Sequence, residues 1–326
     1  MVEPVERRLE LRDMPDAPLR RMMEIRYMED RIQALFDEGE VRGTTHLAAG
    51  QEAVAVSLAA ATEVTDPLTC TYRGHAYALA LGIPIEAVLA EILGRTSGCA
   101  GGMGGSMHLT ASNVGLLPTF AIVGAGIPVA AGAAFAAKYR GSHGLAVAVF
   151  GDGATNIGAF HETLNISAVL ELPLLFVCEN NLYGEYSPVG TTTAGSIAER
   201  PKPFGIPSLT VDGQDYALMS ETFSSLVAEM RQTGGPRFVE ALTYRYSGHS
   251  RSDPGAYRPE GELDQWLRRD PLTLEARRLL DNGLVSEERI RLLEQEAATE
   301  VESALELALG VPEPEPHTMF LNIYAT

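Results

Sequence analysis

An aspartate and two asparagines stand where their side chains could bind a metal ion together in this chain of 326 residues. Asp152 follows the apolar run 145–150, and Asn180 and Asn181 follow the apolar run 174–178. Short apolar runs of this kind are typical of strands buried on both faces, so these polar side chains are expected at strand ends. Carboxylate and carboxamide oxygens suit Mg²⁺, which often shares its coordination shell with phosphates.

The residues around Asp152 also suit a phosphate. Gly151 and Gly153 would let the backbone pass close to a ligand. Apolar spacing predicts a helix over 159–172, and the amides of Gly153 and Ala154 at its mouth would face an anion. The pattern therefore predicts a magnesium diphosphate site at the carboxyl edge of a parallel sheet. A lone Gly-Asp-Gly is more often an ordinary corner between a strand and a helix.

Gly-Asp-Gly followed by the asparagine pair resembles the thiamine diphosphate motif. The stretch 151–183 is similar to the alpha subunit of the decarboxylating dehydrogenase component of 2-oxo acid dehydrogenase complexes, a group that includes acetoin dehydrogenase alpha subunits. The resemblance implies the thiamine diphosphate-binding fold, an α/β fold with a doubly wound, mostly parallel sheet and helices on both faces. It also implies that Asp152, Asn181 and the main-chain carbonyl of Tyr183 hold Mg²⁺.

Two earlier segments carry the same resemblance. His46 lies on a loop at 43–52, and in the family this histidine lies over the reactive ring of the cofactor; a structural histidine is the alternative. Tyr72 and Arg73 end a strand predicted from Leu68, and they match the pair that contacts the diphosphate. Arginine offers a planar fork for phosphate oxygens, although a surface ion pair is the alternative.

Residues 120–128 resemble the family segment whose backbone meets the aminopyrimidine ring, a contact assigned here to Ala121 and Val123. Ala121 replaces the usual glycine, so the contact requires a backbone conformation that alanine can adopt. The Gly-Ala-Gly at 124–126 could instead begin a dinucleotide-binding loop. Val129 stands where the third glycine should be, and no convincing strand is predicted before it, so that alternative is weak.

Two loops depart from the family pattern. The glycine-rich loop 98–108 lacks the usual lysine, so its mobility or docking could differ; His108 is expected to anchor it and is assigned no chemistry. In the loop 247–254, His249 matches the retained histidine near the diphosphate and the substrate channel. Ser247 replaces the first histidine, which puts a relay of two histidines in doubt and bears on substrate choice.

Ser250 and Ser252 occupy positions that are phosphorylated in some relatives, but the sequence alone does not indicate regulation.

The composition excludes several functional classes. Acidic residues outnumber basic ones by 43 to 25, which gives a formal charge of -18 and no basic footprint for nucleic acid. Three scattered cysteines indicate neither a disulfide framework nor a zinc site. The charged N-terminus lacks the apolar core of a signal peptide, and no apolar run is long enough to span a membrane, so a cytoplasmic location is expected.

The chain divides into three predicted parts: an N-terminal tail and helix (1–40), the cofactor-binding α/β domain (41–260), and a C-terminal helical extension and tail (261–326). Residues 1 to 16 are expected to be a solvated tail. Apolar spacing predicts helices at 18–38, 53–61, 85–93, 129–138, 216–230 and 285–307, strands at 209–211 and 237–246, and an apolar tail at 320–324.

The resemblance implies a thiamine diphosphate- and Mg²⁺-dependent enzyme that decarboxylates a 2-oxo acid or cleaves acetoin and passes the acyl unit to a lipoylated acyltransferase. His46 and His249 are the candidates for proton transfer and for carboxylate or oxyanion stabilisation. The family's activating glutamate comes from a beta subunit, so an alpha2beta2 heterotetramer is expected. The alternatives are a split transketolase-like subunit that uses no lipoate, and a non-catalytic scaffold, which should have lost the metal-binding Asp or Asn.

Overall fold

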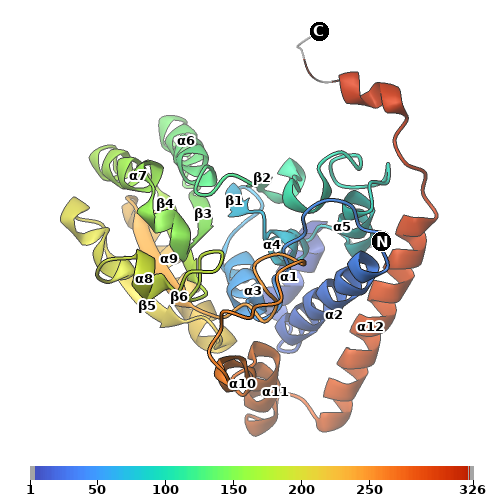
Figure 1. The fold of residues 1–326 in the computed structure, drawn as a ribbon. Coiled ribbons are helices and arrows are strands. Elements are labelled where there is room, and N and C mark those ends of the chain that lie inside the picture. The colour runs from blue at the N-terminus through green and yellow to red at the C-terminus, as the bar shows by residue number, and fades with distance from the viewer. Residues whose placement is uncertain (1–3, 322, 324–326) are drawn as a thin grey trace.

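The protein is built around one six-stranded parallel sheet (Figure 1), seen in a computed structural model that describes residues 4–321 and 323. The strands are β1 (Leu68–Thr71), β2 (Leu116–Phe120), β3 (Ala146–Gly151), β4 (Leu174–Asn180), β5 (Ser208–Asp212) and β6 (Arg237–Leu242). They lie in the order β2-β1-β3-β4-β6-β5, and every hydrogen-bonded pair is parallel. All six carboxyl ends therefore meet at one edge of the sheet.

Helices cover both faces of the sheet, which confirms the predicted doubly wound α/β fold. They are α1 (Pro4–Asp13), α2 (Ala17–Asp37), α3 (Glu52–Ala61), α4 (His75–Ala80), α5 (Ile85–Ile92), α6 (Gly126–Tyr139), α7 (Gly158–Val169), α8 (Val189–Thr192), α9 (Tyr216–Thr233), α10 (Glu262–Leu267), α11 (Pro271–Asp281) and α12 (Glu287–Leu309). Among the described residues, no helix has both the length and the apolar character needed to cross a membrane.

The central strands bury both faces because their side chains alternate between two hydrophobic clusters. In β3, Val147 and Val149 join the cluster that contains α3 and α9, whereas Ala148 and Phe150 join the cluster that contains α6 and α7. This double burial explains why the strands are continuous apolar runs without polar alternation. The sheet is thereby held rigidly behind the edge where its polar ends gather.

The helices at the two ends of the chain lie together. Helix α12 packs along α2 and α5, as Figure 1 shows on one side of the molecule. Both end segments contribute to the same hydrophobic cluster as the central domain, for example through Ile25 and Val301. The three-part division of the chain stays a prediction.

The prediction of a solvated tail over residues 1 to 16 was wrong for the part that the structure describes. Helix α1 occupies this segment, and Leu11 is buried. Arg8 is also buried, and its guanidinium donates a hydrogen bond of 2.9 Å to the carbonyl of Ala59, while Arg12 donates to the carbonyl of Ala60. The helix is therefore attached through arginines that cap the end of α3, an interaction that apolar spacing cannot reveal.

Three strand predictions also need correction. Strand β2 precedes Gly124 after all; it contains Pro118 and lies at the edge of the sheet, where a residue without an amide donor is tolerated. Strand β1 ends at Thr71, so Tyr72 and Arg73 follow it. Strand β6 ends at Leu242 and not at 246, because the chain then leaves the sheet and the Tyr246 amide bonds to the carbonyl of Ala49.

The predicted apolar tail is exposed where it is described. Phe320, Leu321 and Ile323 are more than half exposed, and residues 322 and 324 lie outside the described residues.

The aromatic cluster behind β3 and β4 should dominate the stability of this part of the fold. Phe176 is fully buried, with its ring centroid 6.5 Å from those of Phe150 and Phe238. We expect Phe176→Ala to lower the free energy of unfolding by about 3–5 kcal/mol, because it removes buried surface and leaves a cavity. Phe320→Ala, at a side chain that is 71% exposed, is the control. Equal effects of the two substitutions in denaturant titrations would contradict this packing.

Candidate active site

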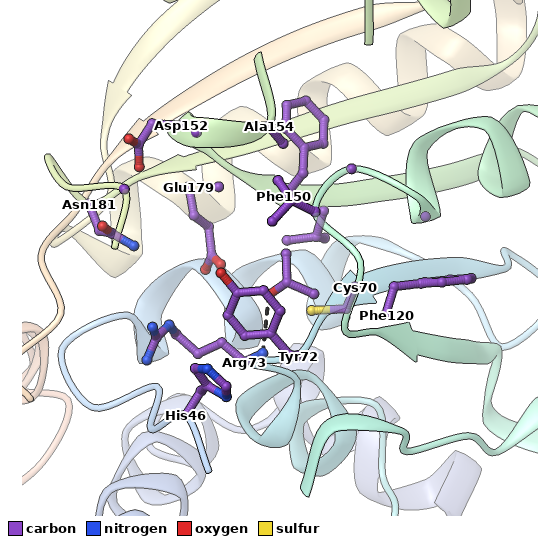
Figure 2. Close-up of a pocket in the computed structure, with 18 of the residues that line it drawn as sticks. His46, Cys70, Tyr72, Arg73, Phe120, Phe150, Asp152, Ala154, Glu179 and Asn181 are labelled. Atoms are coloured by element: carbon purple, nitrogen blue, oxygen red, sulfur yellow. Dashed lines mark hydrogen bonds between the residues drawn. The ribbon is translucent and has the colours of Figure 1, made fainter. Parts of the chain in front are cut away.

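One cavity of about 420 Å³ lies at the carboxyl edge of the sheet (Figure 2). All of the predicted site residues line it: His46, Tyr72, Arg73, Ala121, Val123, Asp152, Gly153, Ala154, Asn181, Tyr183 and His249. They come from six separate parts of the sequence, and the structure brings them together because parallel strands end at a common edge. Their roles toward a ligand stay predictions.

Asp152 and Asn181 stand at the tips of the neighbouring strands β3 and β4. The strands are in register, with Gly151 opposite Glu179, so the residues that follow them are close. The backbone amide of Asn181 donates a hydrogen bond to the Asp152 carboxylate. Burial raises the pKa of Asp152 to about 6, because its side chain is almost completely removed from water. A cation beside this carboxylate would favour its charged form.

The turn that follows carries Tyr183, which also lines the cavity. Leu182, between Asn181 and Tyr183, has a φ of +73°, a region that leucine rarely adopts and that tends to mark functional sites. Among the described residues, no group of three histidine, cysteine or acidic side chains could hold a metal. A metal here would instead take carboxylate, carboxamide and carbonyl oxygens, which are ligands that Mg²⁺ accepts.

The glycine after Asp152 leaves room for a ligand. A Cβ atom on Gly153 would meet only the Cα of Gly184, at 4.0 Å, so the surrounding protein does not itself require glycine here. Close approach of a ligand to the backbone would explain it. The prediction that the amides of Gly153 and Ala154 lie at the start of a helix was wrong, however. Gly153 and Ala154 belong to the 3-10 turn Asp152–Asn156, and α7 begins later, at Gly158.

Alanine fits at position 121 without backbone strain. Among the described residues, only Glu171 and Leu182 combine a side chain with a positive φ, so Ala121 has a conformation that any residue adopts. The substitution of the family's glycine therefore leaves the predicted backbone contact possible.

Two buried guanidinium groups face the cavity without a carboxylate partner. Arg73 is 5% exposed and donates to the carbonyls of Leu47 and His249, the latter at 2.9 Å. Arg245 is 1% exposed, and its hydrogen bonds also go to neutral oxygens. Neither forms an ion pair within the described part of the chain. Burial, and then the charge of Arg245, lowers the pKa of Arg73 to about 10. Two buried cations that no carboxylate contacts in the described structure favour the binding of an anion here.

Three rings form the wall nearest Arg73. The His46 ring centroid lies 4.3 Å from that of Tyr72 and 5.1 Å from that of His249. Burial and the neighbouring Arg73 lower the pKa of His46 to about 3 and that of His249 to about 4, so both imidazoles are neutral near pH 7. The Nδ1 atoms of both histidines are buried without a hydrogen-bond partner in the described structure. A polar ligand in the cavity would satisfy them.

Comparison with known proteins decides between families that share this type of sheet. A model of the family described as dehydrogenase E1 component matches residues 20–317. The chain is 37% identical over 309 residues to the alpha subunit of acetoin:2,6-dichlorophenolindophenol oxidoreductase from Cupriavidus necator, covering 94% of this chain and 93% of that protein. The corresponding protein of Bacillus subtilis is 36% identical over 310 residues, with coverage of 94% and 92%. The human mitochondrial pyruvate dehydrogenase E1 component subunit alpha, somatic form, is 38% identical over 309 residues, with coverage of 94% and 78%. The chain belongs to the dehydrogenase E1 component family.

Membership of the E1 family confirms the resemblance that the thiamine diphosphate motif suggested, and it implies thiamine diphosphate as the cofactor. The cavity fits that group in three respects. The unpaired guanidiniums suit its diphosphate, the oxygen set at the strand tips suits a metal, and the orphaned histidine nitrogens suit a polar ring or a substrate.

The cavity is also lined by a buried carboxyl group that the sequence motifs did not predict. Glu179 is 4% exposed and accepts a hydrogen bond of 2.8 Å from the hydroxyl of Tyr77. Burial raises its pKa to about 7, although Tyr77 and Gln51 hydrogen-bond to it. Gln51 also accepts a hydrogen bond from Asn181, at 3.3 Å, so Glu179 is linked through Gln51 to a predicted metal ligand. Glu179 stands at the polar end of an otherwise apolar run, and this position is the feature of the sequence that could have indicated it.

The glycine-rich loop 98–108 is organised around another carboxylate that the sequence did not reveal. The two oxygens of the fully buried Glu91 accept hydrogen bonds from four loop amides, those of Ala100, Gly102, Gly104 and Gly105. The ring of His75 bonds to the Ser106 hydroxyl at 2.9 Å. The expectation that His108 anchors the loop was wrong, because this side chain is exposed and Glu91 and His75 do so instead.

The neutral histidines make a prediction for the pH dependence of stability. The pKa of His46 falls from 6.5 to about 3 on folding, so the folded protein binds fewer protons than the unfolded chain between these values. The stability that the neutral His46 contributes is fully present above pH 6.5 and is lost as the pH falls. Asp152 and Glu179, whose pKa values are raised, give slopes of the opposite sign. Comparing His46→Gln with the unsubstituted protein therefore isolates the histidine.

We expect the unfolding temperature of His46→Gln, without ligands, to fall less between about pH 7.5 and pH 5 than that of the unsubstituted protein. His143→Gln replaces an exposed histidine and should leave the pH dependence unchanged. Parallel curves for His46→Gln and the unsubstituted protein would show that His46 is not held neutral.

Proposed function

We propose that this chain is the alpha subunit of a thiamine diphosphate- and Mg²⁺-dependent enzyme that decarboxylates a 2-oxo acid or cleaves acetoin, and that transfers the acyl unit to a lipoyl group of an acyltransferase. One observation carries the proposal. Two buried, unpaired guanidinium groups share a cavity with a carboxylate and a carboxamide at adjacent strand tips. This is the charge pattern that a magnesium-bound diphosphate requires.

The metal would be held by the Asp152 carboxylate, the Asn181 side-chain oxygen and the Tyr183 carbonyl. The diphosphate would lie against the Arg73 guanidinium, the Tyr72 hydroxyl and the His249 ring. The amides of the turn that contains Gly153 and Ala154 would add neutral donors. The backbone at Ala121 and Val123, on the opposite rim of the cavity, would meet the aminopyrimidine ring.

Thiamine diphosphate, when bound, supplies the nucleophilic carbon of its thiazolium ring. The protein's part is to position the substrate and to move protons. His46 and His249 are neutral near pH 7, so each can donate one hydrogen bond and accept another. In the proposed reaction they would stabilise a substrate carboxylate or oxyanion and transfer a proton.

The partner would be a beta subunit in an alpha2beta2 assembly. Ile122 and Val123 on the cavity rim are 73% and 48% exposed. Further apolar side chains are exposed on the neighbouring helices α6 and α7 (Figure 1) and directly after α7: Val129, Phe135, Tyr139, Ile166, Val169 and Leu170. An apolar surface beside an active site is typical of a subunit interface. A partner seated there would close the cavity and supply the activating glutamate. The cytoplasmic location expected from the sequence stays a prediction.

The metal site has a direct test. Asp152→Ala removes the only carboxylate of the proposed ligand set, so we expect it to weaken Mg²⁺-dependent binding of thiamine diphosphate by more than about 100-fold in calorimetry. Asp212→Ala is the control. Asp212 also ends a strand at this edge of the sheet, but its carboxylate pairs with Arg269 outside the cavity. Unchanged affinity in Asp152→Ala would contradict the site.

The reaction class has a separate test. We expect turnover of pyruvate, a branched-chain 2-oxo acid or acetoin by the purified assembly to depend on a lipoylated acceptor. Transfer of ketol units to a sugar aldehyde, with no requirement for lipoate, would favour the transketolase-like alternative. A protein that binds the cofactor but turns over none of these substrates would favour the scaffold.

A further inference from the structure

Arg245 holds the turn that carries the proposed third metal ligand. Its Nη1 donates to the carbonyls of Tyr183 and Gly184, at 3.3 and 2.7 Å, and its Nη2 donates to the carbonyl of Glu185, at 2.7 Å. One guanidinium therefore engages three successive carbonyls of a turn about sixty residues away in the sequence. The planar fork fixes their relative directions, which a flexible ammonium group could not do.

The surroundings of Arg245 indicate that this arrangement serves a ligand. The side chain is 1% exposed and has no carboxylate partner in the described structure, although burying a charge without one is costly. Arg26, by contrast, recovers this cost through ion pairs with Glu52 and Asp270. Arg245 lines the cavity, so an anion bound there would supply the missing compensation.

A chain of hydrogen bonds leads from Arg245 to the second histidine. Nη2 of Arg245 donates to the hydroxyl of Tyr257 at 2.6 Å, and this hydroxyl donates to the Asp253 carboxylate at 2.8 Å. The same carboxylate oxygen accepts the backbone N–H of His249 at 2.6 Å. The turn at Tyr183 and the loop at His249 are thus tied to one guanidinium.

We propose that Arg245 is a positioning residue that holds the Tyr183 carbonyl for the metal and, through Tyr257 and Asp253, sets the backbone of His249. This inference rests on the proposed function, because it needs the metal site at the strand tips. Binding of the metal and the position of His249 are then coupled, although Tyr183 and His249 lie on different loops. Arg245 was not predicted as a site residue because it lies inside a run predicted to be a strand. A charged arginine in such a run is the feature of the sequence that could have indicated its role.

The test uses the full chain with its co-purifying partner and titrates MgCl₂ at saturating thiamine diphosphate, followed by calorimetry. We expect Arg245→Lys to weaken Mg²⁺ binding at least tenfold and to lose most of the rise in unfolding temperature that the two ligands produce. The unfolding temperature without ligands should change much less. Arg237→Lys makes the same substitution at the first residue of β6, outside the cavity, and should bind Mg²⁺ as the unsubstituted protein does.

Tyr257→Phe separates the two roles of Arg245, and it decides the matter if Arg245→Lys does not fold. We expect it to retain Mg²⁺ affinity, because the bonds from Arg245 to the carbonyls remain, and to lower kcat at saturating cofactor. An unchanged kcat would overturn the coupling to His249.

Three outcomes are kept apart by the design. If the unsubstituted protein does not bind Mg²⁺ and thiamine diphosphate, the proposed function fails. If it binds both and Asp152→Ala abolishes binding, but Arg245→Lys binds normally, the inference about Arg245 alone is overturned. If Arg245→Lys lowers the unfolding temperature equally with and without ligands, Arg245 is only a structural support, which also overturns the inference.

Discussion

The buried positive charge of Arg73 and Arg245, which no carboxylate contacts in the described structure, is the constraint on which the rest of the site depends. Charges removed from water need compensation, and here the hydrogen bonds of both guanidiniums go to neutral oxygens, while the carboxylates of Glu179 and Asp152 act on them without contact. The arrangement is tolerable if an anion completes it. The cavity also contains a carboxylate at the tip of β3, so a bare anion would meet repulsion there; a metal ion between the two removes that conflict. Guanidiniums, carboxylate and metal ligands are in this sense parts of a single electrostatic arrangement.

The fold creates this arrangement from distant parts of the chain. The parallel sheet aligns the ends of β3 and β4 to within one residue, and its double burial keeps them fixed. The loops above are bound to one another through backbone groups: the amide of Arg251 bonds to the carbonyl of Thr45, and Arg73 bridges the two histidine loops. This chain thus combines a rigid strand edge with loops that its buried arginines hold in place.

Much of this could be predicted because the decisive residues follow strongly apolar runs. The positions of Asp152 and Asn181 needed only two strands and the rule that parallel strands end together. Arg8, Glu91 and Arg245 could not be placed in the same way, because their partners are backbone amides and carbonyls, which every residue carries and which leave no mark on the sequence. Strand β2 was missed because it contains Pro118, and proline argues against a strand unless the strand lies at the edge of the sheet. The position of a strand in the sheet cannot be read from the sequence of that strand. Side-chain chemistry was therefore predictable, whereas side-chain to backbone anchoring was not.

A crystal structure of the assembly with thiamine diphosphate and Mg²⁺ would test the central claim most directly. The account predicts a metal ion about 2.0–2.2 Å from oxygens of Asp152, Asn181 and the Tyr183 carbonyl, with the diphosphate against Arg73. A cofactor seated elsewhere, or a diphosphate held with no metal at the tips of β3 and β4, would contradict it.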